Sequence, residues 1–434
     1  MSSLEKIVQN CAGIDIGSEK VFVCLETEEV KSFRTFTQSY RELGTYLKEH
    51  GIVHVAMEAT GIYWITLYDI LESMDFDVCL VNPADSKNFP GRKTDVQDCQ
   101  WIQQLFSYGL LRKSFVPEDI IRKLRVYTRM REDKLQMGSS HILHMQKALI
   151  EMNIRLPEVL SQTHGASGMA MIQAILQGER DAQSLLNLCT SDLIKRKGAD
   201  ILLALEGNYK EEYLFELQQA YEGYMFYLSQ VKKCDVEIEK ILIEFKKKSG
   251  SDYKDDNKIK PIRHNKPEIK DLHNLLLGIH GANPTVLPGL TDYSLMRLTA
   301  ELGNNITQWP NVKSFVSWLG LAPGKNQSGK TNKRSKKKAM TRSGQIFKQA
   351  AQSLLVSKQP GLGAFARKLK ARRGAAIAIK ATARKLAELY YKTFSNGMQY
   401  VEKGIEIYLL KQKEQQIRFL NKKAVELNMQ LVSI

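Results

Sequence analysis

The feature that most constrains this 434-residue chain is a long stretch without acidic residues. Between Leu302 and Ala387 there is no Asp or Glu, while the same stretch holds 19 Lys and Arg residues, more than the whole-chain net charge of +16. A surface that repels itself this strongly is tolerable only beside a polyanion, and nucleic acid is the usual one. Its Gly, Ser and Thr residues interrupt any continuous amphipathic membrane helix. The stretch therefore predicts a nucleic-acid-binding region.

Length and composition predict a globular protein of two or three domains. No apolar run reaches the ~18–20 residues of a membrane span. The N-terminal sequence MSSLEKIVQN lacks an apolar signal core, so we expect a cytoplasmic, nucleoid-associated protein without a membrane partner. The six scattered cysteines form no C-x-x-C pair, which argues against zinc and a disulfide framework. Cys11, Cys24 and Cys79 lie in apolar runs and are expected in the core.

The front of the chain, residues 8–115, has the pattern of an α/β domain. Residues 11–36 alternate short apolar runs with polar breaks, which predicts a three-strand antiparallel meander. Thr94 has the position of a helix N-cap. Strands in a meander, followed by alternating helices and strands, predict a three-layer domain. The later elements are expected at Tyr40–His50 (helix), Ile52–Met57 (strand), Ile62–Met74 (helix), Phe76–Val81 (strand) and Asp95–Tyr108 (helix).

The rest of the chain is predicted to be mostly helical. Two long helical patterns dominate residues 116–250, at Glu118–Ile154 and Tyr209–Lys248. They predict a coiled coil or stalk, although they could instead cover the α/β domain. The first carries a loose apolar stripe that includes Met130. The aromatic residues of the second are interpreted as packing and are assigned no site. Beyond these helices we expect a polar linker at 251–269, a helical domain at 270–398 and a charged helix at 399–434.

Four carboxylates occupy positions that chemistry can use. Asp15 and Glu58 end predicted buried strands, and ligands collect at strand ends in α/β sheets. Asp95 and Asp98 share one face of a helix because they are three residues apart. Converging acids would repel one another, and a divalent cation such as Mg²⁺, which prefers oxygen ligands, relieves that repulsion. Each of these acids, taken alone, is explained more simply as a turn or capping residue. The prediction of a metal site therefore depends on all four acids occurring together in this order.

A single hydroxyl, Ser328, lies beside Gly329 within the cationic stretch. A serine can attack phosphorus if its proton is removed and the phosphate is held in line. The alternative is that Ser328 belongs to a flexible basic loop that only contacts the DNA backbone. The residues expected to contact nucleic acid are Lys325, Lys330, Lys333, Arg334, Lys336, Lys337, Lys338, Arg342 and Lys348.

Two turns near this serine have simpler interpretations. The sequence from Leu287 to Tyr293 resembles half of a helix–hairpin–helix, whose tight Gly turn offers backbone N–H groups to phosphate. Thr291 replaces the usual second glycine, so the turn could be purely structural. Ser343 and Gly344 are interpreted as the N-cap of the following helix.

Several segments together resemble the DEDD transposases of the insertion-sequence-110 family, which include the Piv-like invertases. They are GIDIGSEKVFVCL, VAMEATGIYW, LVNPADSKNFPGRKTDVQDCQWIQQL, LPGLTDYSLMRLTAELG, FVSWLGLAPGKNQSGK and TRSGQIFKQAAQSLL. The resemblance implies an RNase H-like (RuvC-like) N-terminal domain whose four acids are Asp15, Glu58, Asp95 and Asp98. It implies that Ser328, from a C-terminal transposase domain, becomes covalently joined to DNA.

The resemblance also implies partners. A structured non-coding bridge RNA would choose target and donor DNA, and a dimer or tetramer would form a composite site. Base pairing would then read sequence while the protein reads backbone and shape. Two other functions stay open on the residues alone. One is a metal-dependent nuclease or Holliday-junction resolvase that uses only the acids, and the other is a non-catalytic nucleic-acid-binding protein.

Overall fold

The computed structural model describes residues 5–26, 29–83, 94–324, 326–328, 331–333 and 339–430, with the backbone alone at 326–328, 331–333, 398–405, 408–409 and 412. The chain divides into two compact units, Met1–Pro117 and Glu118–Ile434. Each is considered by itself. Among the described helices, none combines the length and the apolar character that a membrane span requires.

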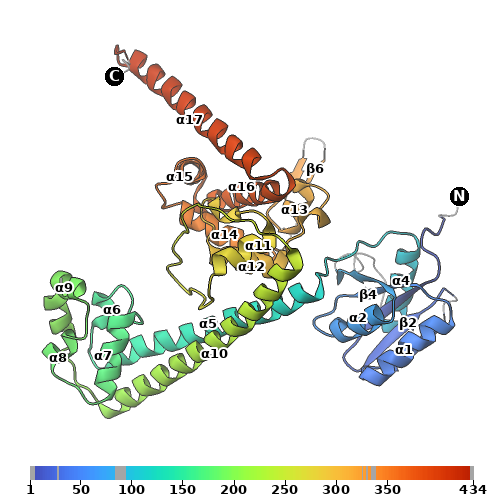
Figure 1. Ribbon diagram of the computed structural model, residues 1–434, viewed down its shortest axis with the longest axis horizontal. Helices are drawn as coiled ribbons and strands as arrows, with labels where there is room; N and C mark the ends of the chain where they lie inside the picture. The colour runs from blue at the N-terminus through green and yellow to red at the C-terminus, as the bar shows by residue number, and fades with distance from the viewer. Residues whose placement is uncertain are drawn as a thin grey trace. The chain divides into compact units, whose positions relative to one another are not determined.

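The first unit contains a five-stranded mixed sheet with the order β3-β2-β1-β4-β5 (Figure 1). The first three strands form the predicted antiparallel meander. Strands β1, β4 and β5 are parallel neighbours, so their carboxyl ends lie at one edge. The strands are β1 (Cys11–Ile16), β2 (Lys20–Cys24), β3 (Val30–Arg34), β4 (His54–Glu58) and β5 (Asp77–Val81).

Helices cover both faces of this sheet, as the sequence predicts. Alternate residues of a strand point to opposite faces. Val55 and Met57 of β4 join the apolar cluster under α1 (Thr37–Glu49) and α2 (Trp64–Ser73). Ala56, between them, joins the cluster that contains Ile102 and Phe106 of α4 (Asp95–Ser107). The predicted three layers are therefore confirmed, and the expected core cysteines Cys11, Cys24 and Cys79 are buried.

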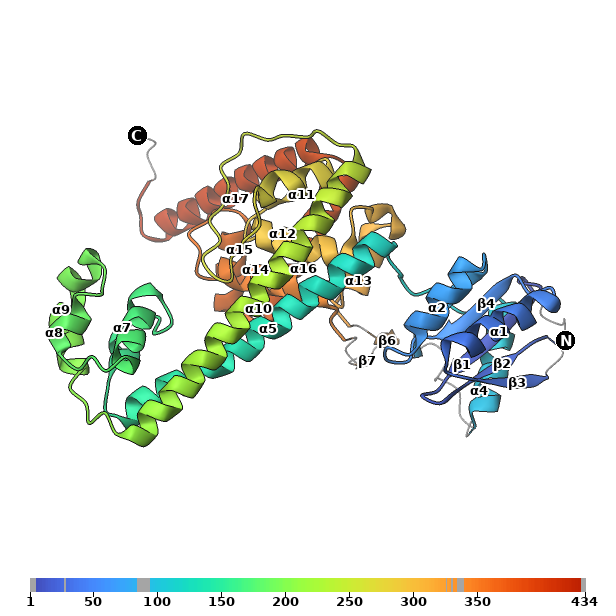
Figure 2. The ribbon, with the colours of Figure 1, turned by 60° about the horizontal axis from the view of Figure 1, so that its bottom comes forward.

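Two long antiparallel helices, α5 (Asp119–Glu151) and α10 (Glu211–Ser249), dominate the second unit (Figure 2). Ion pairs join them along their length, from Glu118–Lys248 at one end to Lys147–Glu216 at the other. The predicted helix pair is confirmed. Four shorter helices follow α5: α6 (Leu156–Val159), α7 (Ala166–Leu176), α8 (Ala182–Leu186) and α9 (Ser191–Ala204).

A buried ion pair lies inside this helix pair. The guanidinium of Arg131, which is fully buried, donates to Asp235 Oδ1 at 2.5 Å and to the Asn265 carbonyl at 3.1 Å. The predicted apolar stripe is wrong at the neighbouring position, because Met130 is 42% exposed. Helical spacing alone cannot show that a charged residue replaces an apolar one when its partner is on another helix.

The remaining helices pack into one body with the α5–α10 pair, except the last one, α17 (Met398–Glu426), whose described side chains are almost all exposed. Arg129 of α5, for example, donates twice to the Glu301 carboxylate, at 2.7 and 2.8 Å. The polar segment predicted as a linker also makes contacts, since Lys260 donates to the carbonyl of Leu287 at 2.7 Å. The helices are α11 (Leu272–His280), η1 (Pro284–Val286), α12 (Asp292–Leu302), η2 (Ile306–Gln308), α13 (Val312–Trp318), α14 (Arg342–Leu354), α15 (Leu362–Arg373), α16 (Ala375–Ser395) and α17 (Met398–Glu426).

Candidate active site and nucleic-acid interface

Asp15 and Glu58 lie at the carboxyl edge of the sheet, on neighbouring parallel strands. Ile14 of β1 is in register with Met57 of β4, and the two acids are the next residues along each strand. Glu58 is only 6% exposed, and its carboxylate accepts a hydrogen bond from Thr60 Oγ1 at 3.3 Å. Asp15 is half-buried. The fold therefore brings these two acids together, as expected from their strand-end positions.

The other two acids occupy the first turn of α4. Thr94 caps this helix as predicted, since its side chain accepts from the Gln97 N–H at 3.3 Å. Asp95 is exposed and Asp98 is half-buried. The N-terminus of a helix carries a partial positive charge, which partly offsets two carboxylates in its first turn.

A glycine that the sequence analysis passed over brings α4 onto the sheet. A Cβ atom at Gly13 would lie 2.4 Å from both the Cys99 carbonyl oxygen and the Gln103 amide nitrogen. The backbone of α4 thus rests directly on β1, two residues before Asp15. A glycine inside a strand often marks such a close approach of backbone, and this was the available signal.

The electrostatics of Asp15 show that the four acids share one region. The pKa of Asp15 is raised to about 6, first by burial and then by the charges of Glu58, Asp95 and Asp98. Burial and nearby like charges both disfavour the ionised form. The charges of the three other predicted acids therefore all contribute to the raised pKa of Asp15.

The same acids are not gathered into a closed ligand shell. Among the described residues, no three His, Cys, Asp or Glu side chains are close enough together to hold a metal ion. The two observations differ because electrostatic repulsion extends further than a coordination bond. The donor set consists of carboxylate oxygens, which suits a hard divalent cation such as Mg²⁺. Such a cation would also relieve the repulsion at Asp15, so the residues fit the implied metal.

Ser328 lies in a hairpin that the sequence analysis did not predict. The strands β6 (Asn326–Ser328) and β7 (Thr331–Lys333) are antiparallel, and Ser328 is in register with Thr331. The backbone of Ser328 therefore belongs to a short strand, and its role stays a prediction. The hairpin belongs to the second unit and the four acids to the first.

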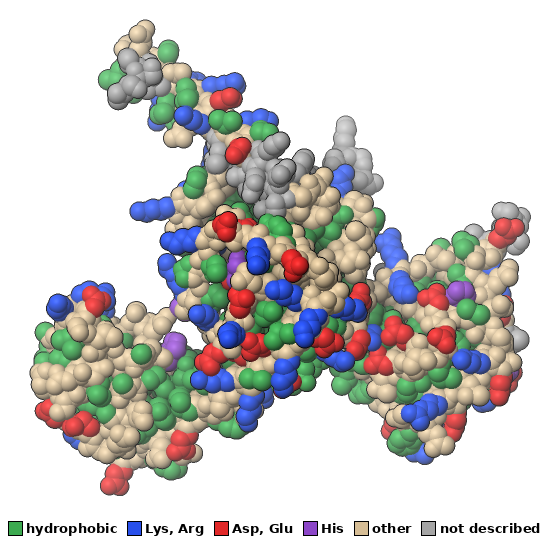
Figure 3. All heavy atoms as spheres, in the orientation of Figure 1, with side chains coloured by type: hydrophobic (Ala, Val, Ile, Leu, Met, Phe, Trp, Pro, Cys, Tyr) green, Lys and Arg blue, Asp and Glu red, His purple; other side chains and the backbone are tan. Residues whose placement is uncertain are grey.

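The predicted nucleic-acid contacts are described only in part. Arg342 begins α14, is about half exposed, and lies 3.6 Å from the Glu132 carboxylate. Lys348 is half-buried on the same helix, and Lys333 is described by its backbone in β7. Exposed basic side chains also cover α15, at Arg367, Lys368, Lys370, Arg372 and Arg373, where basic groups project from the surface in Figure 3. The predicted residues that lie outside the described ones are Lys325, Lys330, Arg334, Lys336, Lys337 and Lys338.

The two turns have structural roles. A Cβ at Gly289 would lie 2.8 Å from the Ala350 carbonyl oxygen, so the turn packs tightly against α14. Thr291 caps α12 through the Ser294 N–H. The N-cap predicted at Ser343 and Gly344 is wrong, because Thr341 accepts from the Gly344 N–H at 3.1 Å. Ser343 lies inside the helix and is buried, two residues too late to cap it.

Two protein-family models match the chain. One, for DEDD transposases of the IS110 type and described as "Transposase", matches residues 12–154 and so includes all four acids. The other, "Transposase IS116/IS110/IS902 family", matches residues 285–367 and includes Ser328. Together they span just over half of the chain. No curated protein matches it.

The matched segments and the RNase H-like sheet define a DNA-cleaving transposase or recombinase. The chain belongs to the IS110 family of transposases. DNA is therefore its partner, and the cationic surface of the second unit is suited to binding it.

Proposed function

We propose that this transposase excises and inserts a mobile element by DNA strand cleavage and exchange, with Ser328 as nucleophile and Asp15, Glu58, Asp95 and Asp98 as Mg²⁺ ligands. The raised pKa of Asp15 is the observation that supports this most, because three further carboxylates contribute to it. Like charges placed together destabilise a fold unless a cation balances them. Perturbed carboxylates of this kind cluster at functional sites.

The reaction is a transesterification at phosphorus. The Ser328 hydroxyl loses its proton as its oxygen forms a bond to phosphorus, and the deoxyribose oxygen leaves and takes up a proton. When bound to the four acids, Mg²⁺ would neutralise negative charge on the phosphate. The basic side chains of the second unit would hold the flanking phosphates and keep the strand in line. Reversal with a different strand as acceptor would complete the exchange.

Sequence choice is assigned to a bridge RNA. The stretch from Leu302 to Ala387 supplies positive charge, and we identified no sequence-reading motif in it. Base pairing would then supply the specificity, while the protein holds the backbones. Because the acids and Ser328 belong to different units, a dimer or tetramer could complete a site with Asp15 of one protomer and Ser328 of another. An active transposase–DNA complex that contains no defined RNA after purification would contradict the proposal that an RNA guides this enzyme.

The decisive experiment compares Ser328→Ala with Ser317→Ala, an exposed serine in the same acid-free stretch. We expect Ser328→Ala to lower strand exchange roughly a thousandfold or more and to abolish the covalent protein–DNA adduct. Nucleic-acid binding should persist, and Ser317→Ala should retain both. An adduct formed by Ser328→Ala protein would exclude this serine as the nucleophile.

A second candidate is a metal-dependent nuclease or Holliday-junction resolvase that uses only the acids. It is favoured by the location of all four acids within a single unit, which could cut DNA without Ser328. It predicts that Ser328→Ala still cuts four-way junctions while Asp15→Asn does not. A protein that bound element ends but never cut them with Mg²⁺ would instead be a binding protein. In each case binding should weaken steeply with salt.

A further inference from the structure

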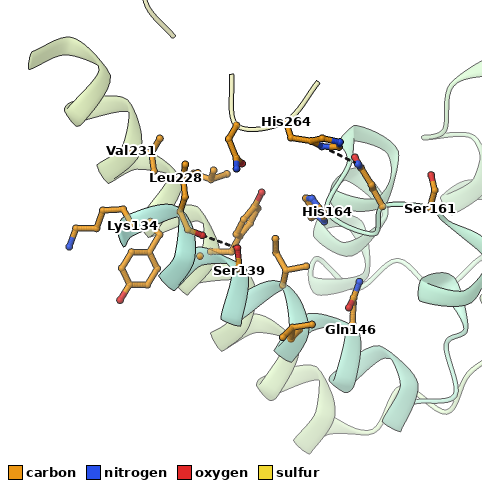
Figure 4. Close-up of a pocket in the computed structure, with 16 residues that line it drawn as sticks. Lys134, Ser139, Gln146, Ser161, His164, Leu228, Val231 and His264 are labelled. Carbon is orange, nitrogen blue, oxygen red and sulfur yellow. Dashed lines mark hydrogen bonds between the residues drawn. The ribbon is translucent and has the colours of Figure 1, made fainter. Parts of the chain in front are cut away.

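A cavity of about 470 Å³ lies along α5 and α10 in the second unit (Figure 4). Residues of both helices line it, and two irregular segments complete it. One follows α6 at Ser161–His164, and the other is His264–Asn265 in the polar segment after α10. The volume falls in the range that protein sites for small ligands occupy.

One part of the cavity is flat and apolar. Tyr224 and Tyr227 of α10 line it together with Ile142, Leu228 and Val231. Gly138 lies opposite the tyrosines, and a Cβ there would be 3.6 Å from Tyr227 and 3.7 Å from Tyr224. The tyrosine side chains therefore pack closely against the backbone of α5 at this point. These surfaces suit a planar ring.

The other part presents polar groups without full partners. His164 Nδ1 is buried and has no hydrogen-bond partner. His164 lines the cavity together with Ser139 and His264 (Figure 4). Burial and the nearby His264 lower the pKa of His164, so its ring is neutral at pH 7 and offers one donor and one acceptor. A buried polar atom without a partner costs free energy that a ligand could recover.

Basic residues lie beside the cavity. A second cavity of about 270 Å³ shares eight lining residues with the first and adds Arg131, Lys232, Asp235, Arg263, Lys266 and Glu268. Arg131 pairs with Asp235 and Lys232 pairs with Glu268, so Arg263 and Lys266 supply the excess positive charge. Lys134, on the wall of the first cavity, lies 5.9 Å from the ring centre of Tyr227. A ligand here would therefore have a flat ring, hydrogen-bonding edges and attached negative charge.

We propose that this cavity binds one unpaired nucleobase of a single-stranded nucleic acid. The ring lies against Tyr224 and Tyr227, its edge hydrogen-bonds to His164, and its phosphates lie near Lys134 and Arg263. The proposal rests on the family's action on nucleic acid but not on the chemistry of Ser328. Stacking on aromatic side chains tolerates any base, so RNA and DNA are both possible sources.

The test uses the full chain and short single strands of RNA and of DNA, each with one 2-aminopurine, whose fluorescence falls when it stacks. Ser139→Phe places a ring in the cavity from an exposed position on α5 that tolerates substitution. Ser140→Phe is the matched control, because Ser140 is equally exposed but does not line the cavity. We expect quenching with at least one of the two strands, and affinity on the order of tenfold weaker for Ser139→Phe alone.

The strand that quenches identifies the source. His164→Leu keeps the bulk of the side chain and removes its polar atoms. It should also lower the affinity for the strand that shows quenching several-fold. Ser328→Ala should leave this binding intact. The binding test can therefore fail or succeed independently of the cleavage assay that tests the role of Ser328. Absence of quenching with both strands would overturn the proposal. Equal affinities of Ser139→Phe and Ser140→Phe, or equal affinity for a strand that is abasic at the probed position, would also overturn it.

Discussion

The two units of this transposase bury charge in opposite ways. In the second unit, Arg131 and Asp235 form a fully buried pair of opposite charges, joined directly by hydrogen bonds. In the first unit, Asp15 is half-buried among three other carboxylates, and its pKa rises to about 6. The first arrangement pairs opposite charges within the protein, whereas the second places like charges close enough to raise the pKa of Asp15. A buried pair of opposite charges thus belongs to the packing of the second unit, whereas clustered carboxylates mark the candidate site of the first.

The largest effect on stability is expected from breaking the buried pair. Arg131→Met leaves Asp235 as an uncompensated buried carboxylate, which costs about 3–5 kcal/mol of the free energy of unfolding. Urea denaturation of the second unit measures this loss. The double variant Arg131→Met/Asp235→Leu should recover much of it, because both charges are then gone. A double variant as unstable as the single one would mean that the pair acts through its backbone contacts.

A smaller loss is expected where α4 meets the sheet. Gly13→Ala puts a methyl group 2.4 Å from backbone atoms of Cys99 and Gln103, so α4 must move. We expect a loss of about 1–3 kcal/mol, measured by denaturation of the first unit. Gly198→Ala, in α9, is the control, since its Cβ meets side-chain atoms only at 3.6 Å or more. Strand cleavage should fall as well, because Asp95 and Asp98 move with the helix.

Removal of a repelled acid is expected to stabilise the protein. In EDTA, Asp15→Asn should raise the free energy of unfolding at pH 7 by about 1 kcal/mol, a value discounted for the partial exposure of Asp15. The folded pKa lies above the unfolded one, so the wild type loses stability as pH rises from about 4 to about 6. The difference between the proteins should therefore disappear below pH 4. If Asp15→Asn were less stable than the wild type at pH 7, this would contradict the repulsion between Asp15 and the other three acids.

The smallest effect concerns the cation itself. Mg²⁺ at about three times its dissociation constant should stabilise the wild type by about 0.8 kcal/mol, seen as a higher Tm. Asp15→Asn should lose most of this response. Lys147→Ala, which removes only exposed ion pairs in the second unit, should keep it. A Tm shift of equal size in all three proteins would place Mg²⁺ binding elsewhere.

Local signals in the sequence predicted much of the first unit. The alternation along β1–β3, the cap at Thr94 and the spacing of Asp95 and Asp98 depend on neighbouring residues, so they can be read from the sequence. Gly13 and Arg131 could not be interpreted in this way, because the groups they meet lie about ninety to a hundred positions away. The β6–β7 hairpin is too short for its polar residues to show an apolar alternation. The roles of the four acids and of Ser328 stay predictions.

The antiparallel course of α5 and α10 has a consequence for how such chains can vary. The excursion of the chain along α5 and back along α10 begins and ends at the same place. Lys248, near the end of α10, lies beside Glu118, which precedes α5, and their charged groups are 3.3 Å apart. Because the two ends of this helical hairpin lie side by side, both helices can be lengthened or shortened by the same number of turns. Such a change does not displace the segments before and after the hairpin. The part of this excursion after residue 154 lies between the two family-matched segments, so new recognition surfaces can be added there while the rest of the enzyme is left unchanged.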